Sequence, residues 1–223
     1  MSKTLLITGA SSGIGAETAR QAAKAGWNVA LMARSADKLE ALAEEIGDRA
    51  LALRGDVTDY DEVERAVTKT VETFGGLNAA FANAGRGGKP GGAEKGDVDD
   101  WKGMIDLNVM GLLNTVRAAL PELHKTTGHM ILTGSAAGRV HLSGSVYGAT
   151  KWFVHGFAGN LAEEMKEWGG RCTVVAPGMV DTPFFDEAKP DKLKPEDVAA
   201  AVMHALEADP RCAVREVFLM PTG

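Results

Sequence analysis

Two side chains of one predicted helix have the chemistry and the spacing to exchange a proton with a substrate. Tyr147 and Lys151 stand four positions apart, which places them on the same helix face, one turn from each other. The phenol alone has a pKa of about 10 and exchanges its proton poorly at neutral pH. A nearby ammonium group favours the phenolate, so we expect Lys151 to lower the pKa of Tyr147 and make it an acid/base. Such pairs also occur by chance on helices, so the surrounding elements decide between the two interpretations.

The first 25 residues have the order of a phosphate-binding unit. An apolar strand at 4–8 leads into a glycine-containing turn at 9–15, and a helix is predicted over 16–25. Glycines let the backbone approach a pyrophosphate, and the helix N-terminus supplies N–H donors and a positive dipole end. A Walker-type loop would need a Lys after the turn, and none stands there; the remaining alternative is a tight turn without a ligand. The candidate contacts are Gly9, Ser11, Ser12, Gly13, Ile14 and Gly15.

The end of the second predicted strand, at 28–33, bears on which dinucleotide would bind. An acidic residue there would accept hydrogen bonds from the adenosine ribose and repel a 2′-phosphate. This chain has Ala33 at that place, followed by Arg34 and Ser35. A guanidinium can pair with a 2′-phosphate and a hydroxyl can add a hydrogen bond. The pattern favours NADP(H) over NAD(H); the alternative is a solvated Arg34 at a helix start.

Strands and helices alternate along the rest of the chain. Further strands are predicted at 49–54, 77–82, 129–133, 171–176 and 216–220, and helices at 59–74, 98–123, 147–168 and 195–206. This alternation is typical of one parallel sheet covered by helices on both faces. A glycine-rich loop at 86–92 is expected to be mobile and close to the cofactor. No repeat or linker divides the chain, so residues 1–223 are expected to form a single domain.

Bulk properties exclude several classes of partner. The 223 residues carry a formal net charge of -6 and no basic run, which argues against a nucleic-acid surface. No apolar run reaches the roughly 20 residues that span a bilayer, and no leader pattern is present, so a cytoplasmic protein is expected. Cys172 and Cys212 form no redox or metal motif, and the five His lack metal-ligand spacing. No metal site is expected.

Seven motifs stand in the order of one family and span nearly the whole chain. They are Thr8-Gly9-x-x-x-Gly13-x-Gly15, Asp56, Asn83-Ala84-Gly85, Asn108-Val109-x-Gly111, Gly134-Ser135, Tyr147-x-x-x-Lys151 and Pro177-Gly178. With these motifs the sequence closely resembles the short-chain dehydrogenase/reductase family. The resemblance implies an α/β fold, a single Rossmann-like doubly wound domain with about seven parallel strands in the order 3-2-1-4-5-6-7. It also implies a homotetramer or, as second choice, a homodimer.

The resemblance assigns catalytic roles to four residues. Tyr147 would exchange a proton with the substrate oxygen while hydride passes to or from the nicotinamide. Lys151 would lower the pKa of Tyr147 and bind the nicotinamide ribose, and Ser135 would hydrogen-bond the substrate oxygen. Asn108 would anchor a water that links Lys151 to solvent.

Cofactor contacts follow from the same resemblance. Besides the first turn, they are Arg34, Ser35, Asp56, Val57, Asn83, Ala84, Gly85, Tyr147, Lys151, Pro177, Gly178, Val180 and Thr182. Asp56 would meet the adenine and Thr182 the carboxamide. Ala82 departs from the more usual Asn, and Ser135 stands about one residue closer to Tyr147 than is usual in the family, which shortens the loop between them.

Three residues are candidates for the substrate pocket: His141, Met179 and Phe184. With Arg139, His141 could bind a substrate carboxylate, although a solvated loop is the alternative. The apolar residues at 179, 184 and 185 are expected to form pocket wall or core rather than a second cofactor site. The region after Pro177-Gly178 is short, which suggests an open pocket for a small substrate.

The expected function is NADP(H)-dependent interconversion of a carbonyl and a secondary alcohol on a small molecule. A dinucleotide-binding sensor or scaffold on the same fold is the alternative. Such proteins typically lose the Tyr or the Lys, and both are present here. An NADP-dependent epimerase or dehydratase would normally need an additional substrate domain, which is not expected here.

Overall fold

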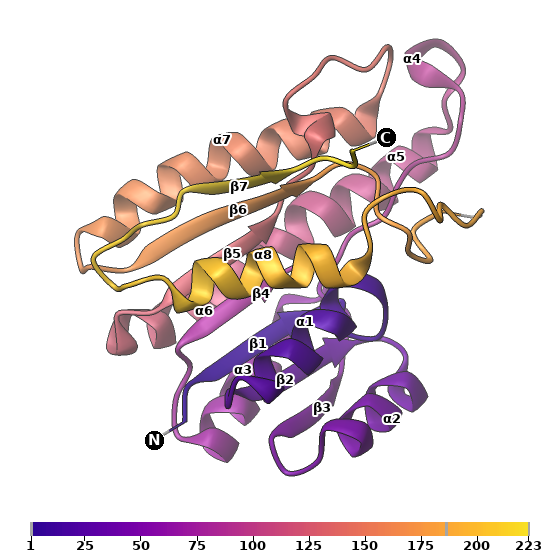
Figure 1. The fold of residues 1–223 in the computed structure, drawn as a ribbon. Coiled ribbons are helices and arrows are strands. Elements are labelled where there is room, and N and C mark those ends of the chain that lie inside the picture. Colours follow the sequence, from indigo (N-terminus) through magenta and orange to yellow (C-terminus); the bar gives the residue numbers. More distant parts are fainter. Residues whose placement is uncertain (1, 186, 223) are drawn as a thin grey trace.

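The computed structural model describes residues 2–185 and 187–222, and its central feature is a seven-stranded parallel sheet (Figure 1). The strand order is β3-β2-β1-β4-β5-β6-β7, as predicted. The strands are β1 (Thr4–Thr8), β2 (Asn28–Ala33), β3 (Ala50–Arg54), β4 (Ala79–Ala82), β5 (His129–Thr133), β6 (Arg171–Pro177) and β7 (Glu216–Leu219).

The strands in the middle of the sheet are buried on both faces. Leu5 and Ile7 of β1 pack into one hydrophobic cluster, while Leu6 packs into the other. Successive side chains of a strand point to opposite faces, so a strand covered on both sides must be apolar at every position. This explains why the chain shows short continuous apolar runs rather than alternating patterns.

Helices cover both faces of the sheet. α3 (Tyr60–Phe74), α6 (Gly111–Thr126) and α7 (Val146–Lys166) bury residues in the cluster that contains Leu6. On the other face, α1 (Gly13–Lys24), α2 (Ala36–Ile46) and α8 (Pro195–Glu207) bury residues with Leu5 and Ile7. The doubly wound arrangement is therefore confirmed, and the carboxyl ends of the strands lie at one edge, where ligand sites of such sheets form.

The helix predicted over 98–123 is not one regular helix. It consists of α5 (Val98–Ile105), a π-helical turn η1 (Asp106–Met110) and α6. The N–H of Gly111 bonds to the carbonyl of Asp106, five residues back, where an α-helix would bond four back. Asn108 lies in this turn.

Three smaller differences concern the chain around the strands. Two short helical segments, α4 (Gly92–Lys95) and η2 (Ala136–Gly138), were not predicted. The fourth strand begins at Ala79 rather than at position 77, and the side chain of Asn78 just before it accepts a hydrogen bond from the N–H of Thr4. Among the helices formed by residues 2–185 and 187–222, none combines the length and the apolarity needed to cross a membrane.

Candidate functional site

Tyr147 and Ser135 meet at the carboxyl end of the sheet. Ser135 lies two residues after the end of β5, and its Oγ accepts a hydrogen bond from the N–H of Ala137 at 3.1 Å. Tyr147 lies in the first turn of α7, which Ser145 caps by accepting from the N–H of Gly148 at 2.9 Å. The Ser135 hydroxyl lies close enough to the Tyr147 phenol to affect the pKa of that phenol. The structure thus brings the two together as the motif predicts.

The direction of the Tyr147 pKa shift differs from the expectation. Burial raises the pKa of the phenol above its ordinary value, and the neighbouring Ser135 hydroxyl lowers it by less. Lys151 was expected to pull that pKa down. Its Nζ lies 5.8 Å from the centre of the Tyr147 ring and donates instead to the carbonyl oxygen of Thr133 at 2.8 Å. The expected lowering of the Tyr147 pKa is therefore wrong.

Lys151 carries a buried amine near the Tyr147 ring. Only 6% of the residue is exposed, and burial lowers the pKa of its amine to about 8. Burial disfavours the charged form, so this amine releases its proton far more readily than a surface lysine. The carbonyl of Thr133, at the end of β5, orients the amine.

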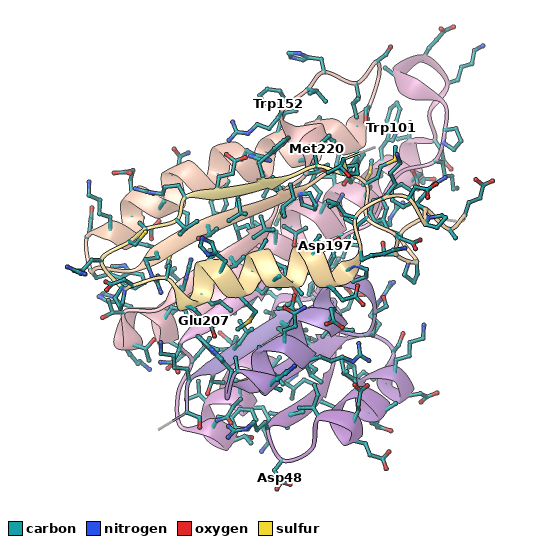
Figure 2. The ribbon with its side chains drawn as sticks, viewed as in Figure 1. Asp48, Trp101, Trp152, Asp197, Glu207 and Met220 are labelled. Carbon is teal, nitrogen blue, oxygen red and sulfur yellow. The ribbon has the colours of Figure 1, made fainter. Side chains whose placement is uncertain are left out.

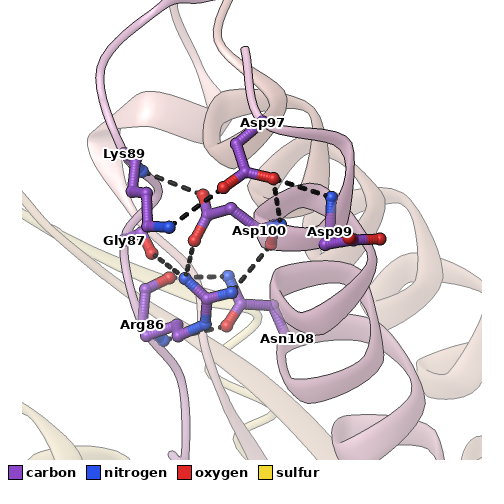
Figure 3. Close-up of polar contacts among 7 residues, drawn as sticks. All are labelled: Arg86, Gly87, Lys89, Asp97, Asp99, Asp100 and Asn108. Carbon is purple, nitrogen blue, oxygen red and sulfur yellow. Dashed lines mark hydrogen bonds and ion pairs between the residues drawn. The ribbon is translucent and has the colours of Figure 1, made fainter.

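Asn108 lies in the π-helical turn η1 and is 2% exposed. Its Oδ1 accepts from the backbone N–H of Arg86 at 2.9 Å, and its Nδ2 donates to the backbone oxygen of Arg86 at 2.9 Å (Figure 3). The second Nδ2 proton is directed at the Thr150 hydroxyl, 3.2 Å away, which itself donates to the carbonyl oxygen of Tyr147. The sequence did not indicate Arg86 or Thr150 as parts of the site.

The turn after β1 is built to approach a ligand closely. A Cβ placed on Gly15 would lie 2.5 Å from the carbonyl oxygen of Gly9, which no side chain could tolerate. Gly13 has a φ of 53°, in the left-handed region that glycine adopts without strain. In the described chain the Ser12 hydroxyl makes no capping hydrogen bond to the start of α1. The first N–H groups of α1, those of Gly13, Ile14 and Gly15, therefore fit a phosphate.

Asn83 joins the ends of three strands beneath this turn. Its Nδ2 donates to the carbonyl oxygen of Thr8 at 3.0 Å, and its backbone N–H donates to the Thr8 hydroxyl at 3.1 Å. The Thr133 hydroxyl donates to Asn83 Oδ1 at 3.2 Å. Ala84 packs against Gly9, where an added Cβ would come within 2.9 Å of the Ala84 Cα. These contacts hold the edge of the sheet on which Ala84 and Gly85 lie.

Arg34 and Ser35 lie at the end of β2, at the surface. The Arg34 side chain is 76% exposed, with Nη1 3.9 Å from Asp56 Oδ2. Ser35 begins α2 without using its hydroxyl to cap it in the described chain. The other carboxylate oxygen of Asp56 accepts from the N–H and the hydroxyl of Thr58, and Val57 beside it is buried. The Arg34 guanidinium is thus open to solvent next to the Ser35 hydroxyl at this edge.

The segment after β6 returns over the glycine turn. Pro177 is the last residue of β6, and Gly178 hydrogen-bonds back to the carbonyl of Leu219 at 2.7 Å. Val180 is 5% exposed, and the methyl group of Thr182 lies 3.2 Å from where a Cβ of Gly13 would stand. The predicted cofactor residues from both halves of the chain therefore face one another.

The three predicted substrate residues separate in the structure. The ring of Phe184 lies 5.7 Å from that of Tyr147, tilted by 57°. His141 instead stacks on Trp152 at 5.4 Å, which Figure 2 shows on the outer side of α7. Trp152 follows Tyr147 by five positions, about 140° around the helix axis. Met179 is 51% exposed. Phe184 thus contacts the central tyrosine, while His141 and Met179 remain predictions.

The loop that was expected to be mobile is held by polar contacts at its beginning. Arg86 forms an ion pair with Asp100 at 2.6 Å, and the backbone N–H of Lys89 donates to the other oxygen of Asp100 (Figure 3). Asp100 lies in the first turn of α5, 14 positions from Arg86. No local sequence pattern joins residues at that separation, so this pair could not be found before the fold was known.

Comparison with known proteins gives consistent matches over the whole chain. The sequence model described as short chain dehydrogenase matches residues 3–193. An uncharacterized oxidoreductase of Staphylococcus saprophyticus is 38% identical over 228 residues, covering 98% of this chain and 97% of the relative.

Two solved structures show how well the fold agrees. An alcohol dehydrogenase from the archaeon Thermococcus sibiricus, complexed with 5-hydroxy-NADP, matches with a TM-score of 0.91 at 31% identity, over 100% of this chain and 97% of its own. A 3-ketoacyl-(acyl-carrier-protein) reductase from Brucella melitensis, complexed with NADH, matches with a TM-score of 0.89 at 28% identity, over 97% and 96%. The chain belongs to the short-chain dehydrogenase family.

Proposed function

We propose that this protein is an NADP(H)-dependent oxidoreductase that interconverts a carbonyl and a secondary alcohol on a small-molecule substrate. The observation that carries the proposal is the Ser135 hydroxyl beside the Tyr147 phenol, with the buried amine of Lys151 5.8 Å from the centre of the tyrosine ring. Two neighbouring hydroxyls can both reach a single substrate oxygen. Phe184, against the tyrosine ring, supplies apolar surface for the rest of the substrate.

Three residues have separate roles in the proposed proton transfer. Tyr147 gives its proton to the substrate oxygen in reduction, and Ser135 donates a hydrogen bond to the same oxygen as charge develops there. Lys151 stabilises the phenolate that remains. A bound nicotinamide supplies or accepts the hydride. Because burial raises the pKa of Tyr147, the phenol is protonated at neutral pH, which is the form needed to reduce a carbonyl.

The residues around the strand ends fit a dinucleotide. The glycine turn and the start of α1 would hold the pyrophosphate, Asp56 with Val57 the adenine, and Thr182 the carboxamide. Two observations support NADP(H): the end of β2 bears no carboxylate, and the Arg34 guanidinium is 76% exposed beside the Ser35 hydroxyl. The solved relatives were complexed with 5-hydroxy-NADP in one case and NADH in the other, so the choice rests on Arg34.

The variant Tyr147→Phe tests the function directly. A panel of ketones and aldehydes is offered with NADPH, and oxidation is followed at the NADPH absorbance band. We expect turnover by the wild-type protein and a loss of at least about 100-fold in kcat in the variant, because general acid catalysis contributes that much. NADPH binding should stay within about twofold, since the ring and its packing are retained. Preserved activity in the variant would overturn the assignment.

A non-catalytic dinucleotide sensor is the competing function. It predicts NADPH binding without oxidation of the cofactor by any carbonyl in the panel. The intact Ser135, Tyr147 and Lys151 constellation favours the enzyme.

Assembly into a homotetramer or homodimer is part of the proposal. The apolar side chains of Ile105, Met110, Trp152 and Phe153 on α5, η1 and α7 are more than a third exposed, and large exposed apolar groups mark interaction surfaces. Light scattering after size-exclusion chromatography tests this. A monomer at micromolar concentration would refute it.

A further inference from the structure

Asp100 is a buried carboxylate that takes no direct part in the proposed reaction. The residue is 8% exposed, and both of its carboxylate oxygens are hydrogen-bonded (Figure 3). Oδ1 accepts from Arg86 Nη1 at 2.6 Å, and Oδ2 accepts from the backbone N–H of Lys89 at 2.9 Å. These contacts lower the pKa of Asp100 below its ordinary value, so the group is charged at neutral pH. A buried charge of this kind needs its partners in place.

Both terminal nitrogens of the Arg86 side chain donate hydrogen bonds. Besides the ion pair, Nη2 donates to the backbone oxygen of Asp100 at 2.7 Å, and Nη1 donates to the carbonyl of Gly87 at 3.0 Å. Charge-assisted bonds in a planar fork fix orientation as well as distance. The guanidinium packs closely on Gly103, where an added Cβ would lie 3.1 Å from Nη2.

The backbone of Arg86 in turn fixes the amide of Asn108. The N–H of Arg86 donates to Oδ1 and its carbonyl accepts from Nδ2, each at 2.9 Å. This reciprocal pair allows one orientation of the amide, because reversal would set donor against donor and acceptor against acceptor. The remaining Nδ2 proton points to the Thr150 hydroxyl, which donates to the carbonyl of Tyr147.

We propose that Asp100 and Arg86 are positioning residues: their ion pair sets the Arg86 backbone, which orients the Asn108 amide and, through Thr150, the first turn of α7. Neither side chain touches the reacting atoms. They act on the reaction by fixing Asn108 and the helix turn that carries Tyr147. The kinetic part of this inference rests on the proposed function, whereas the geometric part does not.

The test compares Asp100→Asn with Lys89→Met. Asn keeps the shape of Asp but turns an NH₂ group toward one of the two donors, Arg86 or the N–H of Lys89, and removes the charge. Lys89→Met is the matched control, because it removes the exposed ion pair of the same loop with Asp97 and leaves Arg86, Asp100 and the backbone untouched.

The first readout is the side-chain amide of Asn108 in protein labelled with ¹⁵N at asparagine, assigned by its loss in Asn108→Ala. We expect Asp100→Asn to move both amide proton resonances toward the values of a solvated asparagine and to speed their exchange with solvent. Lys89→Met should leave them in place. If Asp100→Asn leaves the Asn108 resonances unchanged, the positioning role is overturned whatever happens to activity.

The second readout is the split between kcat and cofactor binding. We expect Asp100→Asn to lower kcat for carbonyl reduction about tenfold, since small displacements of catalytic groups cost rate steeply, while the Kd for NADPH changes by less than about twofold. An unchanged kcat beside a displaced amide would overturn the link to the reaction. If the wild-type protein turns over no carbonyl, the proposed function fails, and the resonance readout still decides the geometry.

A second variant is needed in case Asp100→Asn does not fold because it leaves the charge of Arg86 unpaired. Asp100→Asn combined with Arg86→Met removes both charges together, which is far less costly than leaving one buried alone. This double variant should show the same displaced amide and the same loss of kcat. Unchanged Asn108 resonances and full activity in the double variant would also contradict the proposal.

Discussion

Replacing Lys151 by Met should change how stability depends on pH, as well as abolish turnover. The amine is buried, with a pKa of about 8 in the folded protein, against an ordinary value of about 10.4 in an unfolded chain. Met has nearly the same length and shape but no charge. The variant therefore isolates the cost of holding this ammonium inside the protein.

The sign follows from proton binding by the two states. Between pH 8 and about 10.4 the unfolded chain holds the lysine proton and the folded protein has largely released it. Stability rises with pH wherever the unfolded state binds more protons. For these two pKa values the group adds about 1.3 kcal/mol to the free energy of unfolding between pH 7 and pH 9. Below pH 7 its contribution is flat.

Two other buried groups act in the opposite direction at high pH. Burial raises the pKa of Cys172 to about 12 and raises that of Tyr147, so the unfolded chain loses these protons first and stability falls as pH rises. Both groups are present in wild-type protein and in Lys151→Met. The difference between the two proteins at one pH therefore reports on Lys151.

Urea unfolding of both proteins without cofactor, at pH 7 and pH 9, measures that difference. The free energy of unfolding of wild type minus variant should increase by about 1.3 kcal/mol from pH 7 to pH 9. Lys69→Met, at a solvated position, should show no such change relative to wild type. A difference that stays constant for Lys151→Met would mean that the amine is solvated and titrates normally, which would refute the burial argument and the role built on it.

Three further outcomes are expected at other positions. Arg34→Ala should weaken NADPH binding at least about tenfold and NADH binding less than about twofold, since one charge-assisted pair with a phosphate is lost; equal losses in fluorescence titrations would refute the phosphate role. Gly15→Ala should abolish NADPH binding, because its Cβ would lie 2.5 Å from the Gly9 oxygen, and wild-type affinity in that variant would contradict the predicted cradle. Burial lowers the pKa of His129 to about 3, so below about pH 6.5 the unfolded chain binds a proton that the folded chain does not. Wild-type protein should therefore lose about 2 kcal/mol of stability between pH 7.5 and pH 5. His129→Gln should flatten that part of the stability profile measured by urea unfolding, and an unchanged profile would contradict the burial of His129.

The sheet and its order were accessible from the sequence for a physical reason. A strand buried on both faces must be apolar throughout, as Leu5, Leu6 and Ile7 are, and such runs are short and bounded by turn residues. The motif order then supplied the topology. The same motifs predicted that Ser135 lies just beyond the carboxyl end of β5 and that Tyr147 and Lys151 share the helix that follows it, α7.

The parts that the sequence did not reveal depend on contacts between distant segments. The π-helical turn at Asp106–Met110 has no compositional signal, and the partner of Asn108 lies 22 positions away. The stacking of His141 on Trp152 also joins two segments that the sequence does not connect, and the substrate role of His141 stays a prediction. The pKa of Tyr147 was misjudged because burial, which dominates its shift, is a property of the folded surroundings and not of the spacing to Lys151.

Burial of both groups reverses the order in which they release protons. An ordinary lysine holds its proton slightly more tightly than an ordinary tyrosine. Here burial lowers the pKa of Lys151 to about 8 and raises that of Tyr147, because it penalises the ammonium and the phenolate alike. The amine of Lys151 is therefore the more acidic of the two groups in the folded protein, and the phenol of Tyr147 keeps its proton at neutral pH.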